Sequence, residues 1–260
     1  MYVRVFNKDK SKTILFDTGN SPETIIENSK RMRINLDKTE YIVLSHGHYD
    51  HFGGLKSVVK AVRKKDLSII VHEDMLKTRG VASSDGKIRK YALFPTEDQL
   101  KPAKLIYTKQ PFLLGDDLVC VTGEIPRVTS FEHGLMRHKA LLNDSWQPDE
   151  SIVDDRAIVV NVKGKGLVVI SGCAHAGIIN TLFYSRQITG VDNVYAVMGG
   201  FHLAGKGFEE KIEPSIKELA RINPELIVPS HCTGWRAMFA IAKSLPNSFV
   251  WNSVGNFYRL

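Results

Sequence analysis

The feature that most constrains this chain is the segment Ser45–Gly54, which reads SHGHYDHFGG and directly follows an apolar run. It gathers three histidines and one aspartate, namely His46, His48, Asp50 and His51. Imidazole nitrogens and carboxylate oxygens are the groups that divalent transition metals bind in proteins. In an extended backbone alternate side chains share a face, so His46, His48 and Asp50 are expected to converge. The segment therefore predicts a metal site.

Size and composition indicate an ordinary globular protein. The chain has 260 residues, of which 43% are apolar and 24% charged, and no linker divides it, so we expect one domain over residues 1–260. Cys120, Cys173 and Cys232 show no short paired spacing, which favours reduced thiols and a cytoplasmic location. No apolar run approaches about 18 residues, and the first ten residues lack a signal-peptide core, so no membrane partner is expected.

The formal charge of +7 favours anionic partners, either phosphorylated small molecules or nucleic acid. The densest basic run, residues 60–65, ends a predicted helix, where cations are stabilised by the helix dipole. We interpret that run as a solvated helix end. Because aromatic residues are not interleaved with it, a nucleic-acid partner is disfavoured and a small anionic substrate is preferred.

Periodicity predicts strands that alternate with helices. Strands are expected at residues 3–6, 13–16, 41–44, 67–71, 118–121, 157–162, 167–170, 194–197 and 226–228, and residues 249–251 and 257–259 close the chain. Helices are expected at residues 21–32, 54–62, 178–188, 208–221 and 235–244. Residues 74–117 are interpreted as an irregular insertion with one short helix and some strand, and residues 131–150 as loop.

Three further histidines each follow an apolar strand. They lie in the motifs GCAHAG, GGFHL and SHCTG, as His175, His202 and His231. Strand ends are where α/β proteins bind ligands, so each is expected to contact a metal or a substrate. Cys173 shares a face with His175 and offers sulfur, whereas Cys232 is expected to point away as a small buried residue.

The other polar candidates have weaker signals. His138, between two cations, is predicted to be solvated, and His133 is left open between a loop residue and a ligand. Asp17 ends a strand in the sequence Asp17-Thr18-Gly19. A single DTG does not support an aspartic protease, which needs two, so Asp17 is interpreted as a carboxylate that orients a metal ligand.

The order DTG, then HxHxDH, then separated strand-end histidines resembles the metallo-β-lactamase fold superfamily. The motifs TGEIPR (residues 122–127), GCAHAG, GGFHL and SHCTG are similar to its dihydropteroate-synthase-like branch. Members of that branch are named as 7,8-dihydropterin-6-yl-methyl-4-(β-D-ribofuranosyl)aminobenzene 5'-phosphate synthases. They are named for joining a dihydropterin diphosphate to a ribofuranosyl-aminobenzene phosphate.

The resemblance implies an α/β fold, a four-layer αββα sandwich with a metal site along one edge. It implies that His46 and His48 hold one metal, and Asp50 and His51 a second. The C-terminal half would complete the site through His175 and His231. It further implies catalytic roles for Asp50 and His202, an orienting or ligand role for Asp17, Cys173 and His202, and phosphate binding by Arg127. Zinc is the expected ion, with manganese, iron or magnesium as alternatives.

Two departures from the superfamily pattern matter. Relatives follow Ser-Gly with an aspartate that bridges two metals, whereas here Ser171-Gly172 is followed by Cys173. One tightly bound metal, or two unequal ones, is therefore expected. Relatives also carry an additional N-terminal strand and loop that this chain largely lacks.

The resemblance implies a metal-dependent enzyme, either a hydrolase or a pterin-transferring synthase. In a hydrolase the metal would activate a water, whose pKa can fall to about 7. In a synthase it would clamp a diphosphate leaving group. Two alternatives are a metal-dependent nuclease or phosphodiesterase, and a non-hydrolytic diiron redox or sensor protein.

Overall fold

The expected alternation of strands and helices is present in the computed structural model, which describes residues 1–8 and 10–260. Internal contacts divide these residues into two units. Unit 1 comprises Met1–Lys109 and Leu135–Asp154, and unit 2 comprises Gln110–Gly134 and Asp155–Leu260. Each unit has its own β-sheet, its own helices and its own cluster of buried apolar side chains. The expectation of one domain over the whole chain stays a prediction.

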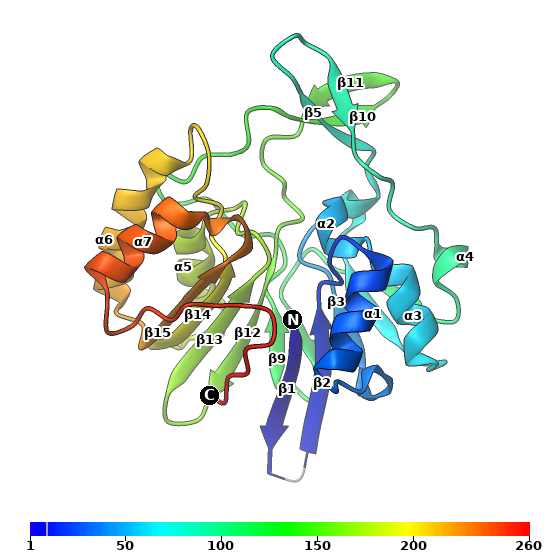
Figure 1. Cartoon of the computed structure of the whole chain (residues 1–260), viewed down its shortest axis with the longest axis horizontal. Helices are drawn as coiled ribbons and strands as arrows, with labels where there is room; N and C mark the ends of the chain where they lie inside the picture. Colours follow the sequence, from blue (N-terminus) through cyan, green and yellow to red (C-terminus); the bar gives the residue numbers. More distant parts are fainter. Residues whose placement is uncertain (9) are drawn as a thin grey trace. The chain divides into compact units, whose positions relative to one another are not determined.

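Unit 1 is built on a five-stranded sheet (Figure 1). Its strands in spatial order are β1 (Tyr2–Asn7), β2 (Lys10–Phe16), β3 (Tyr41–Val43), β4 (Ser68–Val71) and β7 (Lys104–Tyr107). The first two form the expected antiparallel hairpin, and the others are parallel to β2. The carboxyl ends of β2 and β3 therefore meet at one edge, where Asp17 and the histidine segment follow them.

Helices α1 (Pro22–Arg31) and α3 (Leu55–Val62) cover this sheet. The start of α1 is as predicted, because the Ser21 hydroxyl accepts the backbone N–H of Thr24 at 3.3 Å and proline occupies the first helical position. Both helices are amphipathic, and the apolar face of α3 is fully buried against the strands. The short helices α2 (Tyr49–Phe52) and α4 (Glu97–Leu100) complete the α-helices of the unit within the described residues.

A second, antiparallel sheet of unit 1 was not expected in this form. Its strands in spatial order are β11 (Ser145–Pro148), β10 (His138–Leu142), β5 (Arg79–Ala82) and β6 (Ile88–Lys90). The interpretation of residues 131–150 as loop is therefore wrong, and the insertion at residues 74–117 is more regular than predicted. These strands are short and largely exposed, so they lack the apolar alternation by which strands are recognised.

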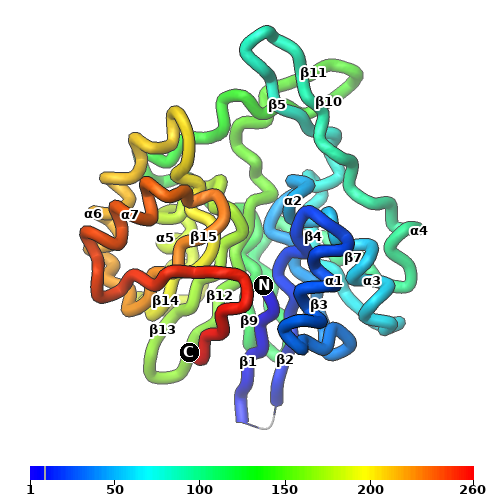
Figure 2. The backbone as a smooth tube through the Cα atoms, viewed as in Figure 1, coloured from blue at the N-terminus to red at the C-terminus, as the bar shows by residue number. Residues whose placement is uncertain are grey.

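Unit 2 contains a six-stranded sheet, whose course Figure 2 traces along the backbone. Its spatial order is β15 (Leu226–Ser230), β14 (Val194–Gly200), β13 (Gly166–Ser171), β12 (Ala157–Val162), β9 (Val119–Val121) and β8 (Phe112–Leu114). The predicted hairpin of β12 and β13 is present, and β13, β14 and β15 are mutually parallel. Three consecutive strands thus end at the same edge, and each carries one of the later histidine motifs.

The helices of unit 2 are α5 (Ile178–Thr189), α6 (Ile212–Ile222) and α7 (Trp235–Ser244), as expected apart from the first residues of the second. Their buried apolar residues pack in one cluster with alternate residues of the strands, among them Val169, Val197 and Ile227. Residues 249–251 and 257–259, which close the chain, form no strand, and an isolated bridge joins Ile227 to Phe249. In the part of the chain that the structure describes, no helix combines the length and apolarity that crossing a membrane requires.

Candidate functional site

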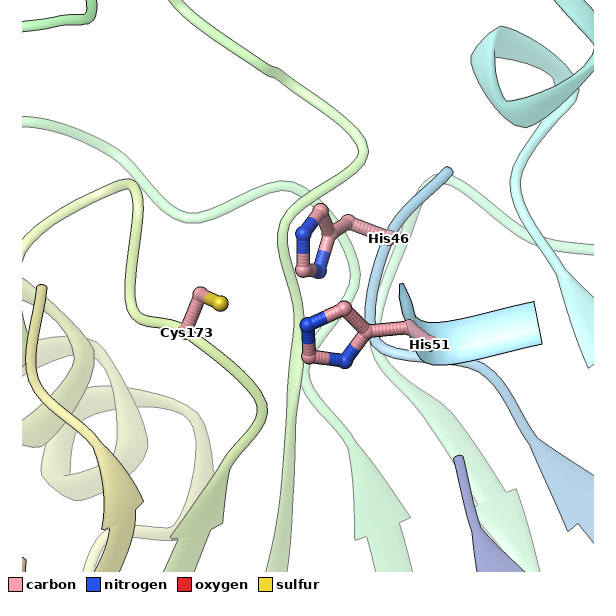
Figure 3. A group of neighbouring side chains, drawn as sticks. All are labelled: His46, His51 and Cys173. Carbon is pink, nitrogen blue, oxygen red and sulfur yellow. The ribbon is translucent and has the colours of Figure 1, made fainter. Parts of the chain in front are cut away.

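Three histidine rings of unit 1 form a tight, buried group. The Nε2 atom of His46 lies 3.0 Å from the Nδ1 atom of His48, and the ring centroids of His46 and His51 are 4.1 Å apart. Figure 3 shows the rings of His46 and His51 side by side. All three side chains are buried, with exposed fractions of 0 to 7%. So dense a group of imidazoles away from water requires an electrostatic reason, and a shared cation supplies one.

Asp50 lies near this group, but on a helix and not in the extended segment that was expected. The chain is not extended through it, because helix α2 begins at Tyr49 directly after His48. Alternate-residue geometry therefore explains His46 and His48 but is wrong for Asp50. The Asp50 carboxylate is exposed and its Oδ2 atom lies 3.6 Å from Nε2 of His51.

Asp17 orients the neighbouring ligand candidates. Its Oδ1 atom accepts the backbone N–H of Ser45 at 2.7 Å, and its Oδ2 atom is 2.8 Å from the Ser45 hydroxyl and 2.6 Å from Nδ1 of His51. With the Nδ1 proton held by a carboxylate, His51 presents its Nε2 lone pair as the ligand atom. Metal-bound histidines in proteins have this arrangement.

A buried ion pair that sequence analysis missed holds the loop between the first two histidines. Arg79 donates from Nη1 and Nη2 to both carboxylate oxygens of Asp154, at 2.8 and 2.5 Å, and from Nε to Asp149 at 2.6 Å. The Asp154 carboxylate also accepts the backbone N–H of Gly47 at 2.7 Å. Arg79 and Asp154 are almost wholly buried. Nothing local in the sequence pairs them, because they lie far apart along the chain.

His48 is held neutral chiefly by its burial. Burial, together with the nearby His138 and Arg79, lowers the pKa of His48 to about 3. Burial alone would raise the pKa of Asp154, but the Arg79 guanidinium lowers that pKa to about 2. A neutral imidazole is the form that binds a metal ion.

His138 is not solvated, which corrects the sequence prediction. It begins β10, and its ring centroid lies 4.9 Å from that of His48 and 5.9 Å from that of Tyr91. The Tyr91 ring in turn meets His48 edge-on at 5.4 Å. The second sheet of unit 1 thus supplies an aromatic wall beside His48, which the loop interpretation could not anticipate.

In unit 2 the structure brings together the three strand-end motifs. Cys173, drawn in Figure 3 on the loop after β13, has its Sγ atom within 4.8 Å of ligand atoms of both His175 and His202. The same cysteine, His231 and Cys232 form a second group in which all ligand atoms lie within 4.8 Å of one another. The ring centroids of His175 and His202 are 4.3 Å apart.

Cys232 faces this group, contrary to the expectation that it points away from His231. Residues His231–Thr233 form a single 3₁₀ turn (η4), so the extended-chain argument does not apply. The Cys232 thiol lies 3.6 Å from the carbonyl oxygen of Cys173. Hydrogen bonds with the side chains of Cys173 and His202 hold the pKa of Cys232 below its ordinary value, against the opposing effect of burial.

Three polar residues support the loop that carries His175. Arg127 donates from Nη2 to the carbonyl oxygen of His175 at 3.0 Å, and the Asp155 carboxylate accepts the N–H of Ala176 at 2.9 Å. The buried Glu132 carboxylate accepts the first amides of α5, those of Ile179 and Asn180, each at 2.8 Å. Sequence analysis missed Glu132 and Asp155, since single acids in irregular segments carry no pattern.

Two other candidates can be placed. The Arg127 guanidinium is half-buried, and burial lowers its pKa against the opposing charges of Asp155 and Glu132. Its contact with the His175 loop is structural, and its role as a phosphate ligand stays a prediction. His133 is exposed, and its backbone carbonyl accepts Nζ of Lys211 at 2.8 Å, which is consistent with a loop residue.

The donor atoms of both clusters suit a divalent transition metal. Unit 1 offers imidazoles and a carboxylate, and unit 2 offers imidazoles and thiols. In unit 2, Nδ1 of His202 is buried and has no hydrogen-bond partner among the described residues. A buried nitrogen of this kind is a suitable metal ligand. The residues present therefore fit the metal that the sequence pattern predicts.

Comparison with known proteins decides the family. The sequence model described as the metallo-beta-lactamase superfamily matches residues 2–133. The chain belongs to this superfamily. A relative from Methanocaldococcus jannaschii, an uncharacterized protein, is 31% identical over 94% of this chain and 88% of its own length. The expected fold class, the α/β metallo-β-lactamase fold, is confirmed, and this fold implies divalent metal binding.

Two named proteins are also similar to this superfamily member. One is the 7,8-dihydropterin-6-methyl-4-(beta-D-ribofuranosyl)-aminobenzene-5'-phosphate synthase of Methanocaldococcus jannaschii, 29% identical over 90% of this chain and 80% of its own length. The other is a crystal structure described as a metal-dependent hydrolase of the beta-lactamase superfamily. It is 25% identical with a TM-score of 0.80, covering 95% of this chain and 88% of the other. The resemblance to the dihydropteroate-synthase-like branch is thus confirmed.

Proposed function

We propose that the protein is a metal-dependent enzyme that acts on a small, phosphorylated substrate. The observation that carries the proposal is the buried imidazole group of His46, His48 and His51, with His51 oriented by Asp17 at 2.6 Å. The metal ligands we propose are those expected from the sequence, namely His46, His48, Asp50, His51, His175 and His231. A bound divalent cation supplies Lewis acidity and can clamp phosphoryl oxygens.

The protein's own residues would prepare this chemistry. The Arg79–Asp154 pair fixes the loop of His46 and His48, so little reorganisation is needed when the metal and substrate bind. Asp50, exposed at the start of α2, and His202 are proposed to carry protons to or from the reacting groups. The net charge of +7 favours the approach of a phosphorylated substrate over a neutral one.

The reaction we favour is of the synthase type. The named relative is a 7,8-dihydropterin-6-methyl-4-(beta-D-ribofuranosyl)-aminobenzene-5'-phosphate synthase, and the GCAHAG, GGFHL and SHCTG motifs of this chain are similar to that branch. In such a transfer the amine nitrogen of the aminobenzene partner forms a bond to the methylene carbon of the dihydropterin and gives up a proton, while the carbon–oxygen bond breaks and diphosphate leaves with its electron pair. Hydrolysis is the second candidate, supported by the name of the similar solved structure. In both reactions an anionic group leaves.

One experiment separates the two. The purified protein is loaded in turn with zinc, manganese, iron or magnesium and given a dihydropterin diphosphate with the ribofuranosyl-aminobenzene phosphate. We expect metal-dependent diphosphate release matched by a coupled product whose mass is that of the two substrates less pyrophosphoric acid. Release without the coupled product would exclude the synthase and favour a hydrolase. No release or product with any metal would contradict the proposed substrate class altogether.

A further inference from the structure

Each of the three loops of the unit 2 cluster contains a non-glycine residue with a left-handed backbone. Ala174, His202 and His231 have φ angles of 55°, 47° and 51°, which lie in the left-handed region that residues with a Cβ avoid. They follow β13, β14 and β15, one in each loop. Such strain persists where the surrounding structure imposes it, and it is concentrated at ligand-binding sites. These backbone conformations therefore indicate a ligand-binding site at the three loops.

These loops bring the thiols of Cys173 and Cys232 close together. Gly200 has its N–H bonded to the carbonyl oxygen of Gly172 at 3.1 Å, which draws the ends of β14 and β13 together. A Cβ on Gly200 would lie 2.4 Å from that carbonyl oxygen and 2.8 Å from Sγ of Cys232. Only glycine allows this approach, and the Sγ atoms of Cys173 and Cys232 lie within 4.8 Å of each other.

The spacing of the donors matches metal coordination. Ligand atoms around a tetrahedral zinc ion are about 3.3–3.8 Å apart, given bonds of about 2.0–2.3 Å. The Sγ atoms of Cys173 and Cys232 and a ring nitrogen of His231 are mutually within 4.8 Å. Modest side-chain rotations close the remaining difference. His175 and His202, grouped with the first cysteine, supply nearby nitrogen donors.

We propose that Cys173 and Cys232 are thiolate ligands of a divalent metal held with His231 in unit 2. The proposal rests on the metal dependence of the proposed function and specifies its metal. Two thiolates select borderline-soft ions such as Zn²⁺, Fe²⁺ or Co²⁺ over Mg²⁺ and Mn²⁺. Binding exchanges the two S–H protons for two S–metal bonds and releases both protons to solvent. Cys173 thus acts as a ligand in its own right at the place where relatives have aspartate.

The test uses the full chain, purified with a thiol reductant and then freed of metal by a chelator. Reloading with Co²⁺ gives a near-ultraviolet sulfur-to-cobalt charge-transfer band only where thiolates bind the ion. X-ray absorption of the Zn²⁺ form detects a sulfur shell at about 2.3 Å. Both are recorded for the wild type and for the variants Cys173→Ser, Cys232→Ser and Cys120→Ala. Cys120 is the matched control, a buried cysteine of β9 in the same unit.

We expect the band and the sulfur shell in the wild type and in Cys120→Ala, and a weaker signal in each of the two serine variants. If metal binds with nitrogen and oxygen ligands only, the thiolate proposal is overturned while the proposed function stands. If no metal binds to the wild type, both fail. The cobalt band and the X-ray absorption of the wild type show whether thiolates bind the metal even where a serine variant does not fold.

Discussion

The two histidine clusters of this protein are positioned by different physical means. In unit 1 the ligand candidates are held by charge, through the carboxylates of Asp17 and Asp154 and the guanidinium of Arg79. In unit 2 they are held chiefly by the course of the backbone at the ends of three parallel strands, with additional hydrogen bonds from Arg127 and to Asp155 in the loop of His175. The comparison teaches that a donor group can be organised by electrostatics or by conformation. The two kinds of cluster should therefore fail under different substitutions.

The largest effect is expected from Asp154→Ala, which leaves the buried Arg79 without its main partner. Breaking a buried ion pair costs about 3–5 kcal/mol. We expect a loss of this order in the free energy of unfolding, measured by urea denaturation, together with a loosened His46 loop. The control is Glu27→Gln, which removes an exposed pair with Arg31 and should cost no more than about 0.5 kcal/mol. Equal losses in the two variants would refute the role given to charge in unit 1.

Lowering the pH should also reveal how far the stability of the protein depends on the Arg79–Asp154 ion pair. The pKa of Asp154 in the folded protein, about 2, lies below its ordinary value of 3.8. A depressed carboxyl pKa contributes stability that is fully present above pH 4 and is lost as the pH falls through the folded value. The unfolding free energy of the wild type should therefore decline between about pH 4 and pH 2, and Asp154→Asn should remove that contribution. A decline of the same size in both proteins would show that this pair does not carry it.

His48→Ala tests the ligand itself. We expect the affinity for the metal to fall by more than about 100-fold, because replacing even a residue that only orients a ligand lowers metal affinity by about 10–100-fold. Metal content and activity should fall together as a result. The fold should persist, because His48 lies in a loop outside the strands. Metal analysis after dialysis and circular dichroism are the measurements. Full metal occupancy in the variant would show that His48 is not a ligand.

Asp17→Asn weakens the orientation of His51 without removing a ligand candidate. We expect a loss of about 10–100-fold in metal affinity, followed by competition with a chromogenic chelator. Ser45→Ala, which removes one neighbouring hydroxyl, should have a smaller effect. If the order of the two variants is reversed, the 2.6 Å contact does not set the tautomer of His51.

Gly200→Ala should disturb unit 2 through shape alone. The new methyl group collides with the carbonyl oxygen of Gly172, and such overpacking costs about 1–3 kcal/mol. The unit 2 metal should be lost with it. Gly190→Ala adds a group that meets nothing within 4 Å but strains a backbone with φ of 67°, so this variant should lose some stability and still keep its metal. The two variants are compared by thermal unfolding and metal content. Unchanged metal binding in Gly200→Ala would contradict the conformational account of this cluster.

How much the sequence could predict follows from the range of the interactions. The start of α1 at Ser21 and the hairpin of β12 and β13 depend on neighbouring residues, and both were predicted correctly. The sheet containing β5 and β10 depends on pairing between distant, polar segments, so its strands were not recognised. Arg79 and Asp154 likewise meet only in the folded chain. Local patterns report local structure and buried apolar periodicity, and long-range polar contacts leave no such pattern.

Within the candidate site the same limit applies at a finer scale. The residue types at His46, His48 and His51 identified the cluster, since few other functions gather imidazoles so densely. The orientation of Cys232 was predicted from extended geometry and was wrong, because a single 3₁₀ turn follows β15. A single turn of helix in place of an extended backbone reverses the side on which the thiol lies. An element of three residues is too short to be detected from sequence periodicity.

The carboxylate of Glu132 has a consequence for how an anion can be bound. Many α/β proteins hold a phosphate on the free amides at the beginning of a helix. Here the amides of Ile179 and Asn180 at the beginning of α5 are already occupied by an acid that the chain itself provides. This helix end therefore repels a substrate phosphate instead of receiving it. Phosphate affinity in this protein should consequently rise and fall with metal loading, because cations must bind the phosphate that a helix N-terminus binds in other α/β proteins.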